Sequence, residues 1–294
     1  MSFGQNNERF QWLLNQEETD EIIKKALDLG INFFDTANCY GSGSSETFIG
    51  NSFKKFVKNR SDIIIATKVF ANEGNLSKEA ILREIDGSLK RLQTDYIDLY
   101  IIHRWDYDHP IEETMETLNE LVKCKKVRYL GCSSIFAYQL LKANTIARKN
   151  GWAEFISIQN HYNLIYREEE RDMIQYLEEE NIVMTPWSPL AGGKLCRPVT
   201  DEKTKRGATP KEIDYPVIAR VKEVADKLKI SMAQVALAWI LSKKLVVSPV
   251  IGATKISQLE ELCQAVKIKL SDEDIKYLEE KYVPHEVMGC RKKP

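Results

Sequence analysis

Short apolar runs alternate with amphipathic stretches along most of the chain, and this alternation limits the fold more than any other feature. The runs are rich in β-branched and aromatic residues, which suits strands buried on both faces of a parallel sheet. Between them, stretches such as residues 77–92 and 112–124 carry apolar residues at helical spacing. We therefore expect an α/β fold, either an open doubly wound sheet or a (β/α)8 barrel. The predicted strands are residues 31–37, 62–69, 95–103, 127–134, 155–160, 182–188 and 246–253.

The ends of the predicted strands favour the barrel. An open dinucleotide-binding sheet usually carries a G-x-G-x-x-G turn after its first strand, and none is present here. Polar or charged residues instead recur where the strands end, and in a barrel those ends meet at one mouth. They are Asp35, Lys68, His103, Ser133, Gln159, Asn160, Ser188 and Thr254. We predict a (β/α)8 TIM barrel over residues 1–294 as one domain, with a C-terminal helix and tail over residues 270–294.

Several predicted helices have recognisable ends. Ser77 stands where it would cap residues 78–92, and Ser231 with Gln234 has the spacing of a capping box. Gly30 follows the first predicted helix, as a C-terminal glycine commonly does. One long irregular segment, residues 190–216, is rich in Gly, Pro and mixed charge. It is either a functional lid over the mouth or a disordered insertion.

Charge and cysteine content exclude several classes of protein. The 294 residues carry a formal net charge of −1, so no field of one sign attracts nucleic acid or a membrane surface. The N-terminal residues MSFGQNNERFQW lack the apolar run of a signal peptide, and no apolar run reaches the length of a membrane span. The six cysteines form no C-x-x-C pair, which argues against a zinc site or a disulfide framework. We expect a cytoplasmic globular protein.

Four ionisable residues at or just past strand ends suggest acid catalysis. A tyrosine has a pKa of about 10, and a nearby ammonium group would lower it. Lys68 could supply that group, Asp35 could hold Lys68, and His103 could orient a carbonyl oxygen for protonation by Tyr40. Each residue alone also has a purely structural explanation. Asp35 could cap a turn, Lys68 could be a solvated lysine, His103 a core histidine and Tyr40 an aromatic that packs on the barrel rim. Their positions on consecutive βα units favour the catalytic reading.

Seven segments, in order and spacing, resemble the aldo-keto reductase superfamily, with a closer likeness to its fungal aryl-alcohol-dehydrogenase-like branch. They are GINFFDTANCYGSGSSETFIG, IIIATKV, DYIDLYIIHRWD, VRYLGCSS, FISIQNHYNL, PWSPLAGG and PVIGATKISQLEE. The resemblance implies a (β/α)8 barrel that binds a nicotinamide cofactor without a Rossmann motif. It assigns Tyr40 as the proton donor, Lys68 and Asp35 as the pair that lowers its pKa, and His103 as the residue that orients the carbonyl.

The resemblance also implies a cofactor site. Ser133 and Gln159, with Asn160 beside them, would bind the nicotinamide carboxamide, and Trp187 would stack on its ring. Backbone and hydroxyl groups of Ser188, Leu190 and Gly192 would surround the pyrophosphate, because small residues let the main chain approach an anion. Lys194 is a further phosphate contact, or else a solvated loop lysine.

The adenosine end of the cofactor is implied in the last segment, where a strand leads into a helix N-terminus. The residues concerned are Gly252, Thr254, Lys255, Gln258 and Glu261. Lys255 beside Thr254 could hold a 2′-phosphate, which favours NADP(H) over NAD(H). Gln258 stands where many relatives have arginine, and Leu262 stands where asparagine is common.

The N-terminus departs from the family pattern, because the first barrel strand that normally precedes SFG is missing. An open barrel would leave unpaired backbone groups. Three explanations are open: the start is a misassigned internal methionine, the N-terminal segment rearranges to fill the gap, or the chain is a degraded copy with little or no activity.

Three functions compete on this evidence. The first is an NADP(H)-dependent oxidoreductase that reduces aldehydes or ketones, or oxidises alcohols. The second is a catalytically impaired, nucleotide-binding regulatory or truncated paralogue, and the third is a barrel hydrolase or aldolase. The intact set Asp35, Tyr40, Lys68 and His103 favours the first. Phe70, Trp105, Tyr107 and Trp152 are candidates for an apolar, aryl-binding pocket. No metal site is expected, and His109 and His161 are read as incidental.

Overall fold

A computed structural model describes residues 2–5, 12–199 and 209–291. The chain divides into two compact units. The N-terminal unit comprises Met1–Ile158, Gly252–Ile256 and Cys290–Pro294. The C-terminal unit comprises Gln159–Ile251 and Ser257–Gly289.

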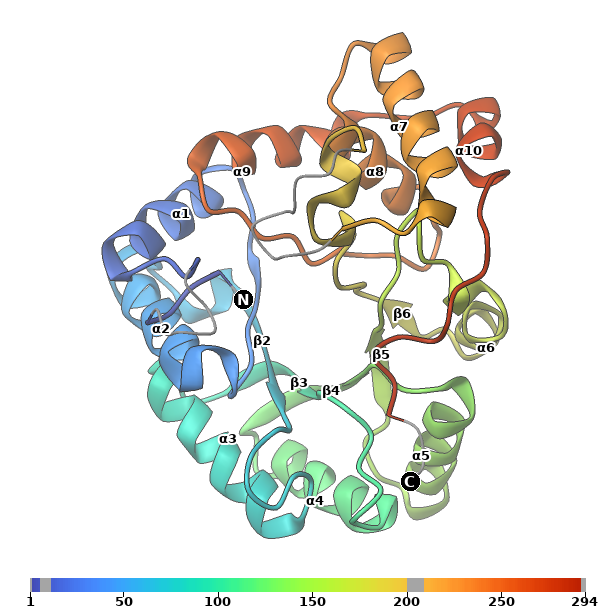
Figure 1. Ribbon diagram of the computed structural model, residues 1–294. Helices are drawn as coiled ribbons and strands as arrows, with labels where there is room; N and C mark the ends of the chain where they lie inside the picture. Colours follow the sequence, from blue (N-terminus) through green and yellow to red (C-terminus); the bar gives the residue numbers. More distant parts are fainter. Residues whose placement is uncertain (1, 6–11, 200–208, 292–294) are drawn as a thin grey trace. The chain divides into compact units, whose positions relative to one another are not determined.

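The N-terminal unit is a parallel sheet with helices packed beside it (Figure 1). Its strands pair in chain order: β1 (Phe33–Asp35), β2 (Ile64–Val69), β3 (Ile97–Ile102), β4 (Val127–Ser133) and β5 (Phe155–Gln159), whose last residue belongs to the C-terminal unit. The helices are α1 (Gln16–Asp28), α2 (Ser44–Phe56), α3 (Lys78–Leu92), α4 (Ile111–Lys123) and α5 (Ala137–Asn150), with the 3-10 turns η1 (Tyr40–Gly43) and η2 (Arg60–Asp62). This part of the chain confirms the predicted alternation of parallel strands and helices.

The core of the sheet explains why the predicted strands are so apolar. Every residue of β3 is buried, and Leu99 and Ile101 pack with Ala66 of β2 and Phe33 of β1. Gly131 of β4 lies so close to β5 that a Cβ there would stand 2.8 Å from Ser157 Oγ. The predicted caps are also confirmed, because Ser77 Oγ accepts from the Ala80 amide and Gly30 ends α1 with a φ of +84°.

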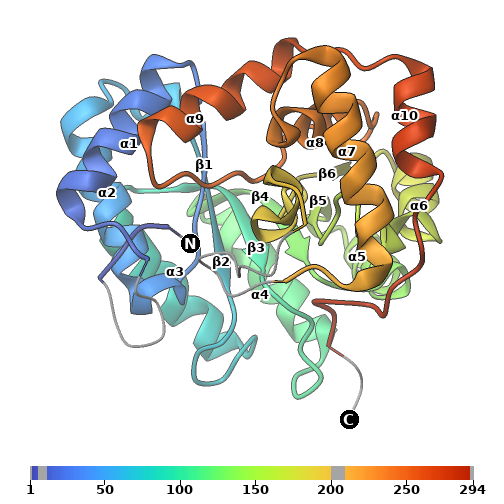
Figure 2. The same ribbon diagram turned by 45° about the horizontal axis from the view of Figure 1, so that its top comes forward.

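The C-terminal unit is mainly helical. It contains β6 (Val183–Met184) and the helices α6 (Met173–Glu180), α7 (Tyr215–Leu228), α8 (Met232–Leu241) and α10 (Asp272–Glu279), with most of α9 (Ile256–Cys263). Short 3-10 turns are η3 (Glu168–Glu170), η4 (Ala191–Cys196), η5 (Glu212–Asp214) and η6 (Gln264–Lys267). Helix α7 packs against α8 and α10 (Figure 2). The predicted capping box at the start of α8 is confirmed, since Ser231 and Gln234 exchange hydrogen bonds.

Two predicted strands are shorter than expected. Residues 182–188 form only the strand Val183–Met184, and residues 246–253 form isolated bridges, Met184 with Val246 and Trp187 with Val250. The prediction of seven full strands was therefore wrong for the described residues, in which six are present. Pro186 and Pro249 lie within these segments, and proline has no N–H to donate to a strand ladder.

The described residues contain no strand before β1, whose neighbour in the sheet is β2. Residues 2–5 instead contact the segment before α1: the Gly4 amide donates to Leu14 O at 3.1 Å, and the Leu14 amide donates to Ser2 O at 2.8 Å. Closure into a single (β/α)8 barrel therefore stays a prediction. Of the predicted loop 190–216, residues 200–208 lie outside the described residues, and the rest contains η4 and η5.

Candidate active site

The sheet of the N-terminal unit brings together the four predicted catalytic residues. Asp35 is the last residue of β1, Lys68 lies near the end of β2, and His103 directly follows β3. The register pairs Asp35 with Ala66 and Lys68 with Ile101, so these strands end at the same edge. Tyr40 opens η1, a few residues beyond β1. The arrangement follows from parallel pairing, which places successive carboxyl ends side by side.

Lys68 is a fully buried cation held by oxygen atoms. Its side chain is 0% exposed, and Nζ donates to Asp35 Oδ1 at 2.5 Å and to Thr36 O at 2.7 Å. Burial alone would lower the pKa of Lys68, but Asp35 outweighs it and the pKa is raised. Lys68 therefore stays protonated at neutral pH.

Tyr40 lies against both Lys68 and His103. Lys68 Nζ is 5.2 Å from the centre of the Tyr40 ring, and the Tyr40 and His103 rings meet edge to face with centres 5.7 Å apart. Burial raises the pKa of Tyr40, while the Lys68 charge acts in the opposite direction. We expected Lys68 to bring the pKa of Tyr40 below its usual value; in this structure burial is the stronger effect and the phenol keeps its proton.

His103 is an uncharged imidazole at neutral pH. Burial, with the positive charges of Lys68 and Arg104, lowers its pKa well below 6.5. Its Nδ1 lies 3.8 Å from Cys39 Sγ. A neutral imidazole has one N–H, and this single donor suits orientation of a carbonyl oxygen.

A close approach of two glycines supports the loop that carries Tyr40. Gly41 has a φ of +54° and Gly4 a φ of +134°, and a Cβ on either would lie 2.5 or 2.6 Å from Ser44 Oγ. Ser44 Oγ donates to Gly41 O at 2.6 Å and accepts from the Gln5 amide at 2.9 Å. Residues 2–5 therefore support the turn that carries Tyr40, the predicted proton donor.

Ser133 ends β4 on the same side of the unit as the four residues above. It is buried, and its hydroxyl is 3.3 Å from that of Ser134. Ser134 in turn accepts a hydrogen bond from Arg104 Nη1 at 2.9 Å. The sequence reading did not single out Arg104, although it directly follows His103.

Among the candidate pocket residues, Trp105 is only 6% exposed and so belongs to the core. The Tyr107 hydroxyl accepts from Gln139 Nε2 at 2.9 Å and donates to Arg291 O at 3.1 Å. The Arg291 guanidinium lies 5.3 Å from the centre of the half-buried Phe70 ring. Trp152, also half-buried, follows α5. His109 bonds Asp106 at 2.9 Å in a loop.

The C-terminal unit contains the predicted nicotinamide-binding residues Gln159, Asn160 and Trp187. Gln159 and Asn160 are buried, and the Trp187 amide donates to Asn160 O at 3.0 Å. Asn160 Nδ2 donates to Glu169 Oε2 at 2.7 Å. Burial raises the pKa of Glu169 to about 7, and Asn160 acts against that rise.

Trp187 is the end of a stack of three rings. His161 lies parallel to Trp187 with ring centres 4.1 Å apart, and parallel to Tyr166 with centres 4.3 Å apart. Two rings that stack on one imidazole must cover its opposite faces, so His161 is enclosed between them. Reading His161 as incidental was therefore wrong: it covers one face of the half-exposed Trp187.

The loop after Trp187 has the geometry expected of an anion-binding turn. Ser188, Gly192 and Gly193 have φ values of +54°, +67° and +96°. Asn163 Nδ2 donates to His161 Nε2 and to Ser188 O, both at 3.0 Å, and so links the ring stack to this loop. Leu190 and Lys194 are half-buried in the same loop. Burial, with the charge of Lys194, lowers the pKa of His161 to about 3.

The residues predicted for the adenosine end are accessible. Gly252, Lys255 and Gln258 are exposed, and Thr254 and Glu261 are half-buried. Gly252, Thr254 and Lys255 belong to the N-terminal unit, whereas Gln258 and Glu261 lie on α9 in the C-terminal unit. Gln234 Nε2 donates to Glu261 O at 3.1 Å. In the C-terminal unit, the half-exposed Trp187 ring and the turn of small residues after it are suited to an aromatic ring and an anion.

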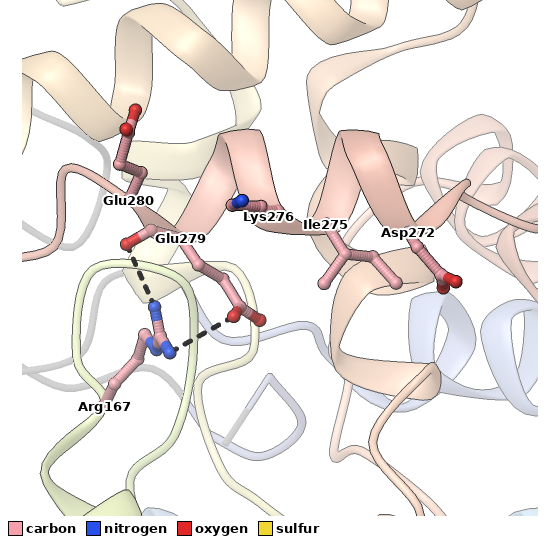
Figure 3. A pocket seen from close by; sticks show the side chains of 6 residues that line it. All are labelled: Arg167, Asp272, Ile275, Lys276, Glu279 and Glu280. Carbon is pink, nitrogen blue, oxygen red and sulfur yellow. Dashed lines mark hydrogen bonds and ion pairs between the residues drawn. The ribbon is translucent and has the colours of Figure 1, made fainter.

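Two other features were compared with this site. A pocket of about 380 Å³ lies beside α10, lined by Arg167, Asp272, Ile275, Lys276, Glu279 and Glu280 (Figure 3). None of the predicted site residues lines it, and Arg167 is already paired with Glu170 at 2.6 Å and Glu279 at 3.4 Å. Within the described ranges, no group of His, Cys, Asp and Glu side chains could hold a metal ion, and no helix is long and apolar enough to cross a membrane.

Comparison with known proteins gives a consistent result. Residues 1–283 match the sequence profile described as the aldo/keto reductase family. An aldo-keto reductase of Fusarium vanettenii is 38% identical, over 97% of this chain and 86% of its own length. Versiconal hemiacetal acetate reductase of Aspergillus parasiticus is 41% identical over 93% of this chain and 89% of its own length. A protein of Schizosaccharomyces pombe, named as an aryl-alcohol dehydrogenase, is 39% identical over 98% of this chain and 92% of its own length.

Proposed function

Since the chain belongs to the aldo/keto reductase family, we propose that it is an NADP(H)-dependent oxidoreductase that reduces aldehydes or ketones, aryl aldehydes among them, and catalyses the reverse oxidation of alcohols. One observation carries the proposal. The buried ammonium of Lys68 is held by Asp35, 2.5 Å away, against the ring of Tyr40, which also contacts the neutral His103. Tyr40 is thus an acid whose neighbours can stabilise both its protonated and its deprotonated form.

The residues divide the work of carbonyl reduction as follows. The nicotinamide cofactor, when bound, supplies the hydride. His103 donates a hydrogen bond that orients the carbonyl oxygen, and Tyr40 gives its phenolic proton to that oxygen as negative charge develops there. Lys68 stabilises the phenolate that remains, and Asp35 keeps Lys68 charged and in place.

The charge states favour this assignment at neutral pH. Tyr40 keeps its proton because burial raises its pKa, and His103 is uncharged because its pKa is lowered. A neutral histidine donates one hydrogen bond without competing as a proton source, so the phenol is the acid available to the substrate oxygen.

For the cofactor, we propose the residues that the family resemblance implies. Ser133, Gln159 and Asn160 bind the carboxamide, Trp187 stacks on the nicotinamide ring, and the turn at Ser188, Leu190, Gly192 and Lys194 binds the pyrophosphate. Gly252, Thr254, Lys255, Gln258 and Glu261 bind the adenosine end, with Lys255 on the 2′-phosphate. Exposed Lys255 supports NADP(H). We further propose one (β/α)8 barrel domain and a cytoplasmic location.

The test is NADPH consumption by the purified chain with nitrobenzaldehyde, compared with the variant Tyr40→Phe. We expect turnover in the wild type, loss of at least about a hundredfold in kcat for the variant, and nearly unchanged NADPH binding. Tyr129→Phe is the matched control, because Tyr129 is 57% exposed and is none of the predicted site residues. No turnover by a folded wild-type chain, or equal turnover in Tyr40→Phe, would reject the proposal in favour of an impaired nucleotide-binding paralogue.

A further inference from the structure

Arg104 joins two strand ends beside the catalytic residues. It directly follows His103, and its Nη1 donates to His103 O at 2.6 Å and to Ser134 Oγ at 2.9 Å. Ser134 follows Ser133, the last residue of β4. The two bonds use both hydrogens of Nη1 and fix the guanidinium between the end of β3 and the end of β4.

Among the residues that the structure describes, the Arg104 guanidinium has no anionic partner, unlike other arginines of the N-terminal unit. Other arginines of the N-terminal unit reach carboxylates: Arg60 lies 2.6 Å from Asp98, and Arg91 lies 2.7 Å from Glu46. Within residues 2–5, 12–199 and 209–291, no carboxylate lies within ion-pair distance of Arg104, and Nε and Nη2 have no hydrogen-bond acceptor. A half-buried cation without a counter-charge is costly, so a charged partner from outside the chain would stabilise it.

The charge of Arg104 reaches the reacting groups. It adds to burial and Lys68 in lowering the pKa of His103, and it opposes the burial that raises the pKa of Tyr40. Nε and Nη2 lie on one edge of the guanidinium plane, the edge that binds both oxygens of a carboxylate. Because Arg104 directly follows His103 and donates to its carbonyl oxygen, we place this edge in the same site as Tyr40 and His103.

We propose that Arg104 binds an anionic group of the substrate, so that this chain prefers aldehydes or ketones that carry a carboxylate. The inference deepens the proposed reductase function and rests on it. Phosphate groups of the cofactor are the other anions near the site, and the experiment separates them from a substrate carboxylate.

The experiment compares carboxylated aldehydes with neutral isosteres at saturating NADPH. The substrate pairs are 4-carboxybenzaldehyde with methyl 4-formylbenzoate, and 3-carboxybenzaldehyde with methyl 3-formylbenzoate. For wild type we expect kcat/KM to be at least about tenfold higher for the acid in one pair, the scale of one charge-assisted hydrogen bond. In Arg104→Gln that ratio should fall to about one. Arg104→Lys, which keeps the charge but not the flat fork, should give an intermediate ratio.

Arg291→Gln is the matched control. Arg291 lies near Phe70 and Trp105 of the same unit, but Asp106 stands 4.0 Å from its guanidinium. Its ratio of acid to ester should equal that of wild type. An acid preference that survives in Arg104→Gln, or that is absent from wild type in both pairs, would overturn the proposal. So would an effect of Arg104→Gln confined to the KM for NADPH, which would assign the arginine to a cofactor phosphate.

A binding measurement separates this inference from the proposed function. Calorimetric titration of benzoate into the NADP⁺-loaded chain should show binding in wild type and Arg291→Gln, and loss of at least about tenfold in affinity in Arg104→Gln. Benzoate binding without turnover of any aldehyde would reject the reductase and leave the anion site standing. If Arg104→Gln does not fold, as judged by circular dichroism, Arg104→Lys decides: an acid-to-ester ratio equal to that of wild type would overturn the proposal.

Discussion

Lys68 places a buried positive charge at the candidate site, and burying that charge reduces the stability of the fold unless a counter-charge compensates it. Its ammonium is completely buried, and its compensation comes from Asp35 and one backbone carbonyl. A buried charge that loses its counter-charge is far more destabilising than an exposed pair that is broken. The proposed catalytic pair therefore also contributes to stability, and activity and stability can be measured separately.

Replacing Asp35 by Asn should destabilise the protein by about 3–5 kcal/mol, because it leaves the Lys68 ammonium buried without a counter-charge. The free energy of unfolding in urea measures this effect. The control is Asp28→Asn, which breaks the exposed pair Lys24–Asp28, with side chains 60% and 56% exposed, and should cost less than about 1 kcal/mol. Equal losses in the two variants would mean that the Lys68–Asp35 pair is not effectively buried.

The pH dependence of the reaction follows from Tyr40 and His103. The pKa of Tyr40 is raised above 10.0 and that of His103 lies well below 6.5, so neither changes its charge between about pH 7 and 9. At saturating NADPH, kcat/KM for reduction should stay constant within about twofold over this range. Alcohol oxidation needs the phenolate and should rise with pH. A basic limb in the reduction profile inside this window would contradict the assignment of charges.

At the scale of secondary-structure elements, close packing contacts hold the Tyr40 turn and the Trp187 ring in place. The turn η1 carries Tyr40 and packs against the N-terminal residues through Gly4 and Gly41, where a Cβ would meet Ser44 Oγ. The ring stack in the C-terminal unit similarly fixes one face of Trp187. We propose Tyr40 and Trp187 for the reaction, and each of these two contacts fixes one of them, so its loss should change activity through geometry.

Gly41→Ala tests the turn. The added Cβ meets Ser44 Oγ at 2.5 Å in a backbone with a φ of +54°, so we expect a loss of about 2 kcal/mol or more and a fall in kcat. Gly151→Ala is the control, because Gly151 has a φ of +65° but nothing within 4 Å of the added Cβ. It should cost about 1 kcal/mol and leave kcat unchanged. Thermal unfolding measures the loss of stability, and steady-state kinetics measure kcat. If Gly41→Ala loses no more stability and no more kcat than Gly151→Ala, the Ser44 hydroxyl moves aside to admit the Cβ.

His161→Leu tests the stack. Without the imidazole, Trp187 loses the ring that covers one of its faces, and Asn163 loses one of its two acceptors, so the Ser188 loop is held less firmly. We expect the Kd for NADPH, measured by quenching of tryptophan fluorescence, to rise about tenfold, an effect of about 1.4 kcal/mol. The control is His109→Leu, in a loop of the N-terminal unit. An unchanged Kd in His161→Leu would limit His161 to a packing role.

Sequence patterns identified the residues that follow strand ends, but not the contacts that depend on tertiary packing. Asp35, Lys68 and His103 could be placed together because each follows an apolar run, and parallel strands end at one edge. Arg104 and His161 carry no periodic signal, and their roles appear only from what the folded chain places beside them. The two prolines that shorten the last strands are visible in the sequence, but the apolar residues around them give the pattern of full strands.

At the scale of the whole molecule, a buried ionisable group makes the free energy of unfolding depend on pH. Glu169 is 6% exposed and its main partner is the amide of Asn160. Burial, with the nearby charges of Asp172 and Glu168, raises its pKa from 4.5 to about 7. The folded state thus prefers the protonated carboxyl, which gives this residue a pH dependence opposite to that of a carboxylate held in an ion pair.

The sign follows from proton uptake. Between pH 4.5 and about 7 the folded chain holds a proton on Glu169 that the unfolded chain has released, so this contribution to stability falls as pH rises and is fully lost above about pH 7. The loss amounts to about 3 kcal/mol.

Glu169→Gln keeps an acceptor for Asn160 without the charge, so it should stabilise the protein at pH 8 and leave it nearly unchanged at pH 5. Glu178→Gln, on the exposed side of α6, should change neither value by more than about 0.5 kcal/mol. The free energy of unfolding in urea at the two pH values measures this effect. If it changes between pH 5 and pH 8 by the same amount in Glu169→Gln as in wild type, the Glu169 carboxyl already ionises freely in the folded protein. Water must then reach that carboxyl beside Asn160.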